Sequence, residues 1–386
     1  MKVFYWSPFI SEVATTYAVI NSIKSIHKFS KNNIVQCKVI DVFNEWDPYQ
    51  KILDQNKIEI VKLKTFLNIK KLPTSGFLKS RLTYILVFFF SIIKLHKKIK
   101  IEKPDFLIIH LISYIPLFLL NLFNFKTKFI LRISGFPKMN FLRKIFWKIS
   151  DKNLYKIFCP TEKTKIKLID ENVFSKEKMH VVNDPVIDVY KISKKIKRDF
   201  DNRYNWLKNK KFVLSIGRLS KQKNFIFLIK NFKKILEKNP DLNLVILGEG
   251  EDRGVLEKLI FDENIKNNVF LLGYQDNIYP FIKASLFFVL TSDWEDPGFV
   301  ILEAMFSRKI ILSSNCESGP KEIISNGSNG FLYKKRDSND FCKNFFLVLE
   351  FIKNKNEVKK IKIKSLLTCK KYTQFNHFKI IKNYLI

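Results

Sequence analysis

The stretch Phe212–Phe225, FVLSIGRLSKQKNF, contains the pattern that decides the fold. Its apolar start, FVLSI, is typical of a buried strand, and Gly217 marks the end of that strand. Two cations, Arg218 and Lys223, follow in the loop, and a helix is predicted to begin near Asn224. Strand, loop and helix in this order make one βα unit, the building block of a parallel sheet covered by helices.

The same rhythm recurs along the whole chain. In the second half, strands are predicted at Leu242–Gly248, Asn268–Gly273, Ser285–Ser292 and Lys309–Ser314. In the first half, they are predicted at Val3–Trp6, Ile34–Ile40, Phe106–Ile109, Lys128–Ile133, Ile157–Pro160 and His180–Pro185. We therefore expect an α/β protein with two Rossmann-like αβα domains that face each other across a cleft.

Composition changes suggest where these domains meet. The 386 residues suit two domains of ordinary size. A polar, Lys-rich segment at 191–209 is predicted to link an N-terminal domain, 1–190, to a C-terminal domain, 210–365. The basic segment 366–386 has a helical pattern, and we expect it to pack back on the first domain.

The charge of the chain is strongly positive. It has 69 Lys and Arg against 36 Asp and Glu, a net charge of +33, which would favour phosphates, anionic lipid or nucleic acid. Lysine is nevertheless abundant everywhere, including the predicted strands, as expected from an AT-rich genome. Much of the charge therefore reflects genomic bias rather than selection for a polyanion.

Cysteines and the amino terminus point to the cytoplasm. The five cysteines are scattered, without a CxxC pair or a zinc-like cluster, so we expect reduced thiols. The start of the chain, MKVFYWSPFI, reads as a first strand rather than a signal peptide.

Two apolar stretches raise the question of a membrane. Leu82–Ile93 is too short to span a bilayer, and Leu111–Phe125 is interrupted by Pro116 and two asparagines. Basic residues flank the first stretch on both sides, which suits a helix lying in a membrane interface with snorkelling lysines. A buried core helix with solvated ends explains the same pattern equally well.

Charged residues follow the predicted strands of the second half, where open α/β sheets bind ligands. Arg218 and Lys223 lie beside a helix N-terminus, and Gly217 permits close backbone approach, so a diphosphate would fit there. Asp296 and Pro297 predict the start of another helix.

That helix start would leave Glu295 in the loop and Glu303 in the second helical turn, from where they could reach different hydroxyls of one polyol ligand. Taken singly, each glutamate reads as an ordinary loop or surface acid. The loop GEGEDRG is spaced GxGxxxG, which is weak evidence for NAD. Its Gly248 and Gly250 mark a tight turn, although their amides could approach a nucleotide.

Four segments together resemble a known family. GRLSKQKN, LVILGEGEDR, EDPGFVILE and SGPKEII…NGSNGFL occur in the order seen in retaining GT-B glycosyltransferases of family GT4, and the likeness covers Phe212–Leu332. Seven residues separate the two glutamates, as in that family. The order of all four segments is far more specific than any one of them.

The resemblance implies a nucleotide-sugar donor, with UDP favoured over GDP, bound by the C-terminal domain. Arg218 and Lys223 would neutralise the diphosphate, Glu303 would hold the ribose, and Glu295 would contact the transferred sugar. The remaining residues implied for the nucleotide are Gly217, Gly248, Gly250, Gly298 and Phe299. Fixed cations would stabilise the departing diphosphate, so no metal cofactor is expected.

The first half resembles the family more loosely. His110 follows the predicted strand DFLII, where many relatives carry an active-site histidine facing the donor sugar. A lone histidine after a strand is otherwise more often structural. Arg132 is a second candidate, for contact with the acceptor or the donor phosphate.

The implied reaction is transfer with retention at the anomeric carbon, by front-face attack in which the leaving diphosphate helps to deprotonate the acceptor. A basic, aromatic-rich first domain suits a lipid-linked or surface-glycan acceptor, as in capsule, O-antigen or lipopolysaccharide assembly. We therefore expect a peripheral enzyme on an anionic membrane surface, at the inner face of the cell membrane.

Two other functions compete with this expectation. A glycogen or starch synthase shares the paired glutamates, but the chain lacks a KxGG-type motif near its N-terminus. A nucleic-acid-binding protein is suggested by charge alone. Because the basic residues are spread rather than striped, and no zinc-finger, RRM or KH signature is present, nucleic acid is not an expected partner.

Overall fold

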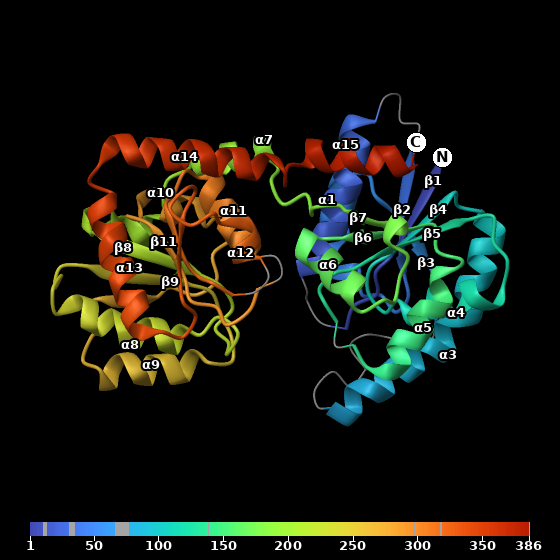
Figure 1. The fold of residues 1–386 in the computed structure, drawn as a ribbon, viewed down its shortest axis with the longest axis horizontal. Coiled ribbons are helices and arrows are strands. Elements are labelled where there is room, and N and C mark those ends of the chain that lie inside the picture. The colour runs from blue at the N-terminus through green and yellow to red at the C-terminus, as the bar shows by residue number, and fades with distance from the viewer. Residues whose placement is uncertain are drawn as a thin grey trace. The chain divides into compact units, whose positions relative to one another are not determined.

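The computed structural model describes residues 1–10, 14–30, 35–65, 77–137, 139–295, 298–316 and 319–385. The chain forms two compact units (Figure 1). Unit 1 comprises Met1–Pro185 and Gln374–Ile386, and unit 2 comprises Val186–Thr373.

The described residues of unit 1 form a seven-stranded parallel sheet in the order β3-β2-β1-β4-β5-β6-β7. Its strands are β1 (Lys2–Trp6), β2 (Gln36–Asp41), β3 (Glu59–Lys62), β4 (Phe106–Ile109), β5 (Lys128–Arg132), β6 (Lys156–Cys159) and β7 (Met179–Val181). Its helices are α1 (Ala14–Phe29), η2 (Asp47–Tyr49), α2 (Gln50–Gln55), α3 (Phe77–Glu102), α4 (Tyr114–Leu122), α5 (Phe141–Asp151), α6 (Glu162–Asp170), η4 (Lys176–Lys178) and α15 (Gln374–Leu385).

Unit 1 buries both faces of its sheet. Because side chains alternate along a strand, Phe4 and Trp6 of β1 join one core cluster while Val3 and Tyr5 join the other. The first cluster includes side chains of α3, α4 and α5, and the second includes side chains of α1 and α15. Strands buried on both faces are almost wholly apolar, which is why they were predictable from sequence.

The described residues of unit 2 form a six-stranded parallel sheet in the order β10-β9-β8-β11-β12-β13. Its strands are β8 (Phe212–Ile216), β9 (Asn243–Leu247), β10 (Val269–Leu271), β11 (Phe288–Leu290), β12 (Ile311–Ser314) and β13 (Phe331–Tyr333). Its helices are α7 (Val189–Ile196), η5 (Asn202–Asn209), α8 (Phe225–Leu236), α9 (Arg253–Asp262), α10 (Tyr279–Ala284), α11 (Phe299–Phe306), α12 (Pro320–Ile323), α13 (Ser338–Phe351) and α14 (Lys355–Lys370).

Each sheet has its strand order reversed about its first strand. β8 lies between β9 and β11, as β1 lies between β2 and β4. At such a reversal, the loops leaving the carboxyl ends of neighbouring strands run to opposite faces and leave room for a ligand. The prediction of two Rossmann-like αβα units is confirmed, and β3 and β13 are strands that the sequence analysis did not include.

Two predicted boundaries differ from the structure. The predicted linker 191–209 is folded, because Ile192, Tyr204 and Leu207 are buried in the core of unit 2. Of the segment 366–386, residues up to Lys370 belong to α14 in unit 2, and only α15 packs on α1 of unit 1 (Figure 1). Among the described residues, no helix is long and apolar enough to cross a membrane.

Candidate active site

Loops from three neighbouring strands of unit 2 form the candidate site. They follow β9, β8 and β11, which lie side by side in the sheet, so their carboxyl ends meet at one edge. The loop after β8 carries Arg218 and Lys223, and the loop after β11 carries Glu295. The sequence prediction that these residues follow strand ends is confirmed.

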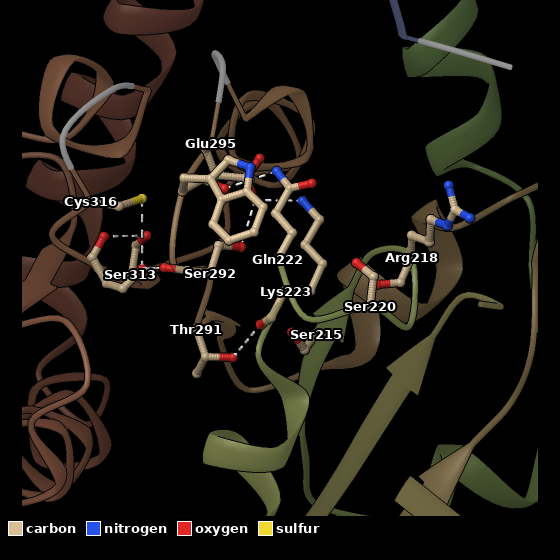
Figure 2. Close-up of polar contacts among 12 residues, drawn as sticks. Ser215, Arg218, Ser220, Gln222, Lys223, Thr291, Ser292, Glu295, Ser313 and Cys316 are labelled. Atoms are coloured by element: carbon tan, nitrogen blue, oxygen red, sulfur yellow. Dashed lines mark hydrogen bonds and ion pairs between the residues drawn. The ribbon is translucent and has the colours of Figure 1, made fainter. Parts of the chain in front are cut away.

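Hydrogen bonds join the β8 and β11 loops directly (Figure 2). The Thr291 hydroxyl donates to the carbonyl of Lys223 at 3.0 Å, and the Asp293 amide donates to the carbonyl of Gln222 at 2.8 Å. The Gln222 side chain in turn donates to the carbonyl of Trp294 at 2.9 Å. These contacts fix the positions of the two loops relative to each other.

Lys223 and Glu295 form a largely buried ion pair at this junction (Figure 2). The side chain of Lys223 is 14% exposed and that of Glu295 is 5% exposed. The Ser292 hydroxyl also donates to the Glu295 carboxylate, at 2.6 Å. A buried charge needs such partners, so each member of this pair depends on the other to remain in the site.

Arg218 lies apart from that pair. It points away from Lys223 (Figure 2) and pairs with Glu251, at 3.0 Å from Nε to the carboxylate oxygen. The Arg218 side chain is 72% exposed, and exposed ion pairs contribute little free energy. The structure thus brings Lys223 to Glu295 but leaves the guanidinium of Arg218 able to move to a ligand at small cost.

A pocket of about 340 Å³ opens beside Arg218. Its wall combines the strand ends of β8 and β9 with the segment after β10, and its lining residues are Ile216, Gly217, Arg218, Leu247, Gly248, Glu249, Tyr274, Gln275 and Ile278. Tyr274 is 72% exposed and offers an aromatic surface. The sequence analysis missed Tyr274, Gln275 and Ile278, because no charged or glycine-rich motif distinguishes their loop.

The glycines of this region allow two loops to pack backbone against backbone. A Cβ atom on Gly248, whose φ is +142°, would lie 1.9 Å from the carbonyl oxygen of Gly217. A Cβ on Gly250 would lie 2.3 Å from the carbonyl oxygen of Leu219. The amide of Gly248 donates to the carbonyl of Gly273 at 2.9 Å. It is therefore held within the sheet edge, whereas the sequence analysis expected that it could approach a nucleotide.

Helix α11 begins at Phe299, after Gly298 in a left-handed conformation with φ of +85°. The predicted start at Asp296 and Pro297 lies outside the described residues. A left-handed residue here favours glycine, and its Cβ position is 3.5 Å from Cβ of Glu295. The amino end of α11 therefore opens directly beside the ion pair.

Glu303 lies one turn further along α11 and accepts a hydrogen bond from the Tyr279 hydroxyl at 3.2 Å. Burial raises the pKa of Glu303, and the Tyr279 hydrogen bond and the charge of Lys195 offset part of that effect. The tyrosine and the lysine come from α10 and α7. Neither was predicted, because they are far from Glu303 in sequence.

Asp293 braces the loop that carries Glu295. Its carboxylate accepts two hydrogen bonds from Arg336, at 2.8 and 2.7 Å, and one from Asn224 at 3.3 Å. A two-point bond between guanidinium and carboxylate fixes orientation as well as position. Asn224 also begins α8, accepting from the Phe227 amide. This brace is a second feature that the sequence analysis missed.

In unit 1, His110 follows β4 and is buried. Its amide donates to the carbonyl of Trp6 at 2.8 Å. Burial, with the nearby charge of Arg132, lowers the pKa of His110 well below its usual range, so the imidazole is neutral. Arg132 is 4% exposed and pairs with Asp184 at 2.5 Å. The sequence predicted that Arg132 contacts the acceptor or the donor phosphate, but its guanidinium is already paired with the Asp184 carboxylate.

A series of hydrogen bonds links α15 to α1 and β1 of the same unit. His377 of α15 contacts the carbonyl of Asn183 through Nδ1 at 2.8 Å and the Ser22 hydroxyl through Nε2 at 2.9 Å, and Ser22 contacts the Tyr5 hydroxyl at 3.1 Å. Burial lowers the pKa of His377 to about 4. The neutral ring with hydrogen on Nδ1 satisfies all three contacts.

Cys37, Cys159, Cys316, Cys342 and Cys369 are free thiols. Within the described part of the chain, no group of three or more His, Cys, Asp and Glu side chains is arranged to hold a metal ion.

Comparison with known proteins finds one family whose model covers the loops of the candidate site. The model of the family described as glycosyl transferases group 1 matches residues 196–365. An uncharacterized glycosyltransferase of Methanocaldococcus jannaschii is 35% identical over 246 residues, which are 60% of this chain and 60% of that protein.

Two further similarities extend the comparison. The N-acetylgalactosamine-N,N'-diacetylbacillosaminyl-diphospho-undecaprenol 4-alpha-N-acetylgalactosaminyltransferase of Campylobacter jejuni is 26% identical over 64% of this chain and 67% of its own length. The crystal structure of Anabaena HepE in complex with UDP superposes with a TM-score of 0.72 at 14% identity, and covers 100% of this chain and 99% of that one. The chain spans only 60% of the length of the first relative and 67% of the second, whereas the likeness in fold extends over the whole chain. Residues 196–365 of this chain are therefore similar to the glycosyl transferases group 1 family, and the chain has the GT-B fold.

Proposed function

We propose that this chain is a retaining glycosyltransferase of the GT4 type that transfers a sugar from a UDP-sugar to a growing surface glycan. The observation that carries the proposal is that Lys223, Glu295 and Gly298 meet at the strand ends of unit 2, with Glu303 one turn into the helix that begins there and a pocket beside Arg218 at the ends of β8 and β9. That cluster falls within the residues matched by the family model.

The donor would bind in three parts. Its base would enter the pocket beside Tyr274, and its ribose hydroxyls would donate to the Glu303 carboxylate. Its diphosphate would lie at the amino end of α11, where unpaired helix amides and the helix dipole favour anions. The description of HepE as a complex with UDP supports a uridine nucleotide for this related fold.

The cations would act on the leaving group. Negative charge accumulates on the diphosphate as the bond to the sugar breaks, and Lys223 and Arg218 would stabilise it. Glu295, freed of part of its ion pair, would accept hydrogen bonds from sugar hydroxyls. Transfer with retention needs no protein nucleophile if the leaving diphosphate takes the proton of the attacking acceptor. We also propose His110, kept neutral by burial, as a contact for the transferred sugar.

We further propose a lipid-linked acceptor and a location at the cytoplasmic face of the membrane. The Campylobacter relative is named for a diphospho-undecaprenol acceptor, which supports this class of substrate. The cations of the site support stabilisation of the leaving diphosphate without a metal ion. Activity that persists in excess EDTA would agree with the metal-free mechanism, and loss of activity restored by Mg²⁺ would contradict it.

The test is thermal stability of the protein against UDP, GDP, ADP and their sugars. A ligand that binds only the folded state raises the melting temperature, by an amount set by its concentration over Kd. We expect a shift with UDP that Glu303→Ala abolishes and that Glu350→Ala, at an exposed position of α13, retains. The anomeric configuration of the product, read by NMR, then tests retention. Folded protein that no millimolar nucleotide stabilises would contradict the proposal.

A further inference from the structure

Helices α3, α4 and α5 lie next to one another on one side of the unit 1 sheet (Figure 1). The Tyr114 hydroxyl of α4 donates to the carbonyl of Tyr84 in α3 at 2.6 Å, and the Asn121 amide of α4 donates to the Ser150 hydroxyl of α5 at 3.0 Å. Their inward side chains join the core, so the three helices form one continuous layer.

The outer surface of this layer is apolar as well. On each helix, large hydrophobic residues recur every fourth position, the spacing of one helical face. These exposed residues, with their exposed fractions, are Ile85 (52%), Phe89 (68%) and Ile93 (63%) on α3, Phe118 (37%) and Leu122 (59%) on α4, and Phe141 (75%), Ile145 (43%) and Ile149 (53%) on α5. We call these eight residues the apolar face. Folded proteins rarely expose so many large apolar side chains on adjacent helices without a binding partner.

Basic residues border the apolar face, and acidic residues are scarce. Lys94, Lys97, Lys98 and Lys100 occupy the last turns of α3, and Arg143, Lys144 and Lys148 alternate with the apolar row of α5. The three helices include only two acidic residues, Glu102 and Asp151, and Glu102 pairs with Lys98 at 3.1 Å. The Lys100 ammonium lies 6.0 Å from the exposed Phe123 ring.

We propose that the apolar face inserts into the interface of an anionic lipid bilayer, with the lysines and arginine at headgroup level. Phe, Leu and Ile rows bordered by Lys and Arg are the composition of helices that lie in a membrane interface. Each basic residue near an anionic surface adds attraction, and long basic side chains reach headgroups while their stems stay in the apolar zone. Protein interfaces, by contrast, are depleted in lysine.

This inference deepens the proposed function and rests on it. An enzyme bound to the membrane could reach a lipid-linked acceptor in that membrane. The two explanations offered for Leu82–Ile93, an interfacial helix and a core helix, would then both apply. Val87 and Leu95 of α3 are buried in the core, whereas Phe89 and Ile93 lie on the solvent side. One helix supplies both a core face and a lipid-facing row.

Vesicle flotation of the full chain tests the proposal. We expect binding to vesicles of phosphatidylcholine with phosphatidylglycerol, weaker binding to phosphatidylcholine alone, and release at high salt. The double variant Phe89→Glu, Phe141→Glu should lower the vesicle-bound to free ratio about tenfold or more. Phe261→Glu, a matched change on α9 of unit 2 at a residue 73% exposed, should leave it unchanged.

Three outcomes would overturn the proposal. The first is that the folded protein does not bind anionic vesicles, and the second is that Phe261→Glu loses as much vesicle binding as the double variant. The third is self-association of the wild type that the double variant abolishes, because the apolar face would then be a contact between copies of the chain. Stabilisation by UDP, measured in every variant, separates this question from catalysis. The double variant should keep the UDP shift, and vesicle binding without a UDP shift in the wild type would refute the donor site alone.

Discussion

Glu303 is a buried acid whose ionised form lowers the stability of the folded protein at neutral pH. Its carboxyl is held among apolar neighbours of α11, with the Tyr279 hydroxyl as hydrogen-bond donor. Because burial raises its pKa, the folded protein binds this proton more tightly than the unfolded chain does. The contribution of Glu303 to stability is therefore greatest at acidic pH, and it is lost as pH rises through the raised pKa.

We predict that Glu303→Gln at neutral pH keeps or raises the melting temperature while weakening UDP binding ten- to a hundredfold. The amide can still accept from Tyr279 and removes a buried charge, but hydrogen bonds from ribose to a carboxylate are worth about 1.5–3 kcal/mol. Calorimetric titration with UDP and thermal unfolding check both effects. Glu350→Gln serves as control, and unchanged UDP affinity in Glu303→Gln would exclude a ribose contact.

The residues of the site were predictable where chemistry was concentrated in a short motif. Lys223, Glu295 and Glu303 follow strand ends in the sequence, and the structure gathers the first two in one ion pair. Partners that come from distant segments were not predictable. Asp293 and Arg336 are 43 positions apart, and no local pattern reports a contact at that separation. For the same reason, the amide of Gly248 was assigned to a ligand although Gly273 accepts its hydrogen bond.

At the scale of elements, α15 completes a domain to which it is not adjacent in the chain. It packs on α1, buries Ile381 and Leu385, and places His377 in the series of hydrogen bonds with Ser22 and Asn183. Protonation of His377 would put a charge in that buried place. Burial and the charge of Arg132 lower the pKa of His377, and the Asn183 carbonyl and the charge of Asp184 offset part of that effect.

We predict that unit 1 loses stability as pH falls from 6.5 to about 4, and that His377→Gln removes part of this loss, because burial also lowers the pKa of His110 well below its usual range. The pKa of His377 is about 4 in the folded protein, against an ordinary value of 6.5. The neutral ring therefore contributes fully to stability above pH 6.5, and this contribution is lost as the pH falls through about 4. The full effect is on the order of 3 kcal/mol. Urea unfolding at several pH values measures it, and His27→Gln, where burial also lowers the histidine pKa but by less, should change the pH slope less than His377→Gln does. An equal pH slope in wild type and His377→Gln would refute the assignment.

Most strands were predictable because a strand covered on both faces is a continuous apolar run. β3 was missed since its sequence, EIVK, has only two apolar residues between two charged ones at the sheet edge, and β13 is only three residues long. The segment 191–209 was read as a linker because its polar and charged residues outnumber its apolar ones. Burial of Ile192, Tyr204 and Leu207 suffices to fold it, and composition does not report which few residues will be buried.

At the scale of the whole molecule, the chain is two units, each with its own sheet and cores on both of its faces. We predict two components in calorimetric unfolding, only one of which moves with UDP, since the proposed donor contacts lie in unit 2. Glu303→Ala should abolish the movement, and His377→Gln should shift the other component alone. A single transition that both variants and UDP move together would contradict this independence.

The return of the chain from unit 2 to α15 sets the order of events during synthesis. Domains that emerge first from the ribosome usually fold first. Unit 1 cannot do so completely, because its α15 is translated only after Val186–Thr373. While that stretch is being made, the apolar surface of α1 and its neighbours awaits a helix that does not yet exist. A nascent chain stalled within unit 2 would therefore present exposed core to chaperones and proteases, and only chains translated through α15 would bury it.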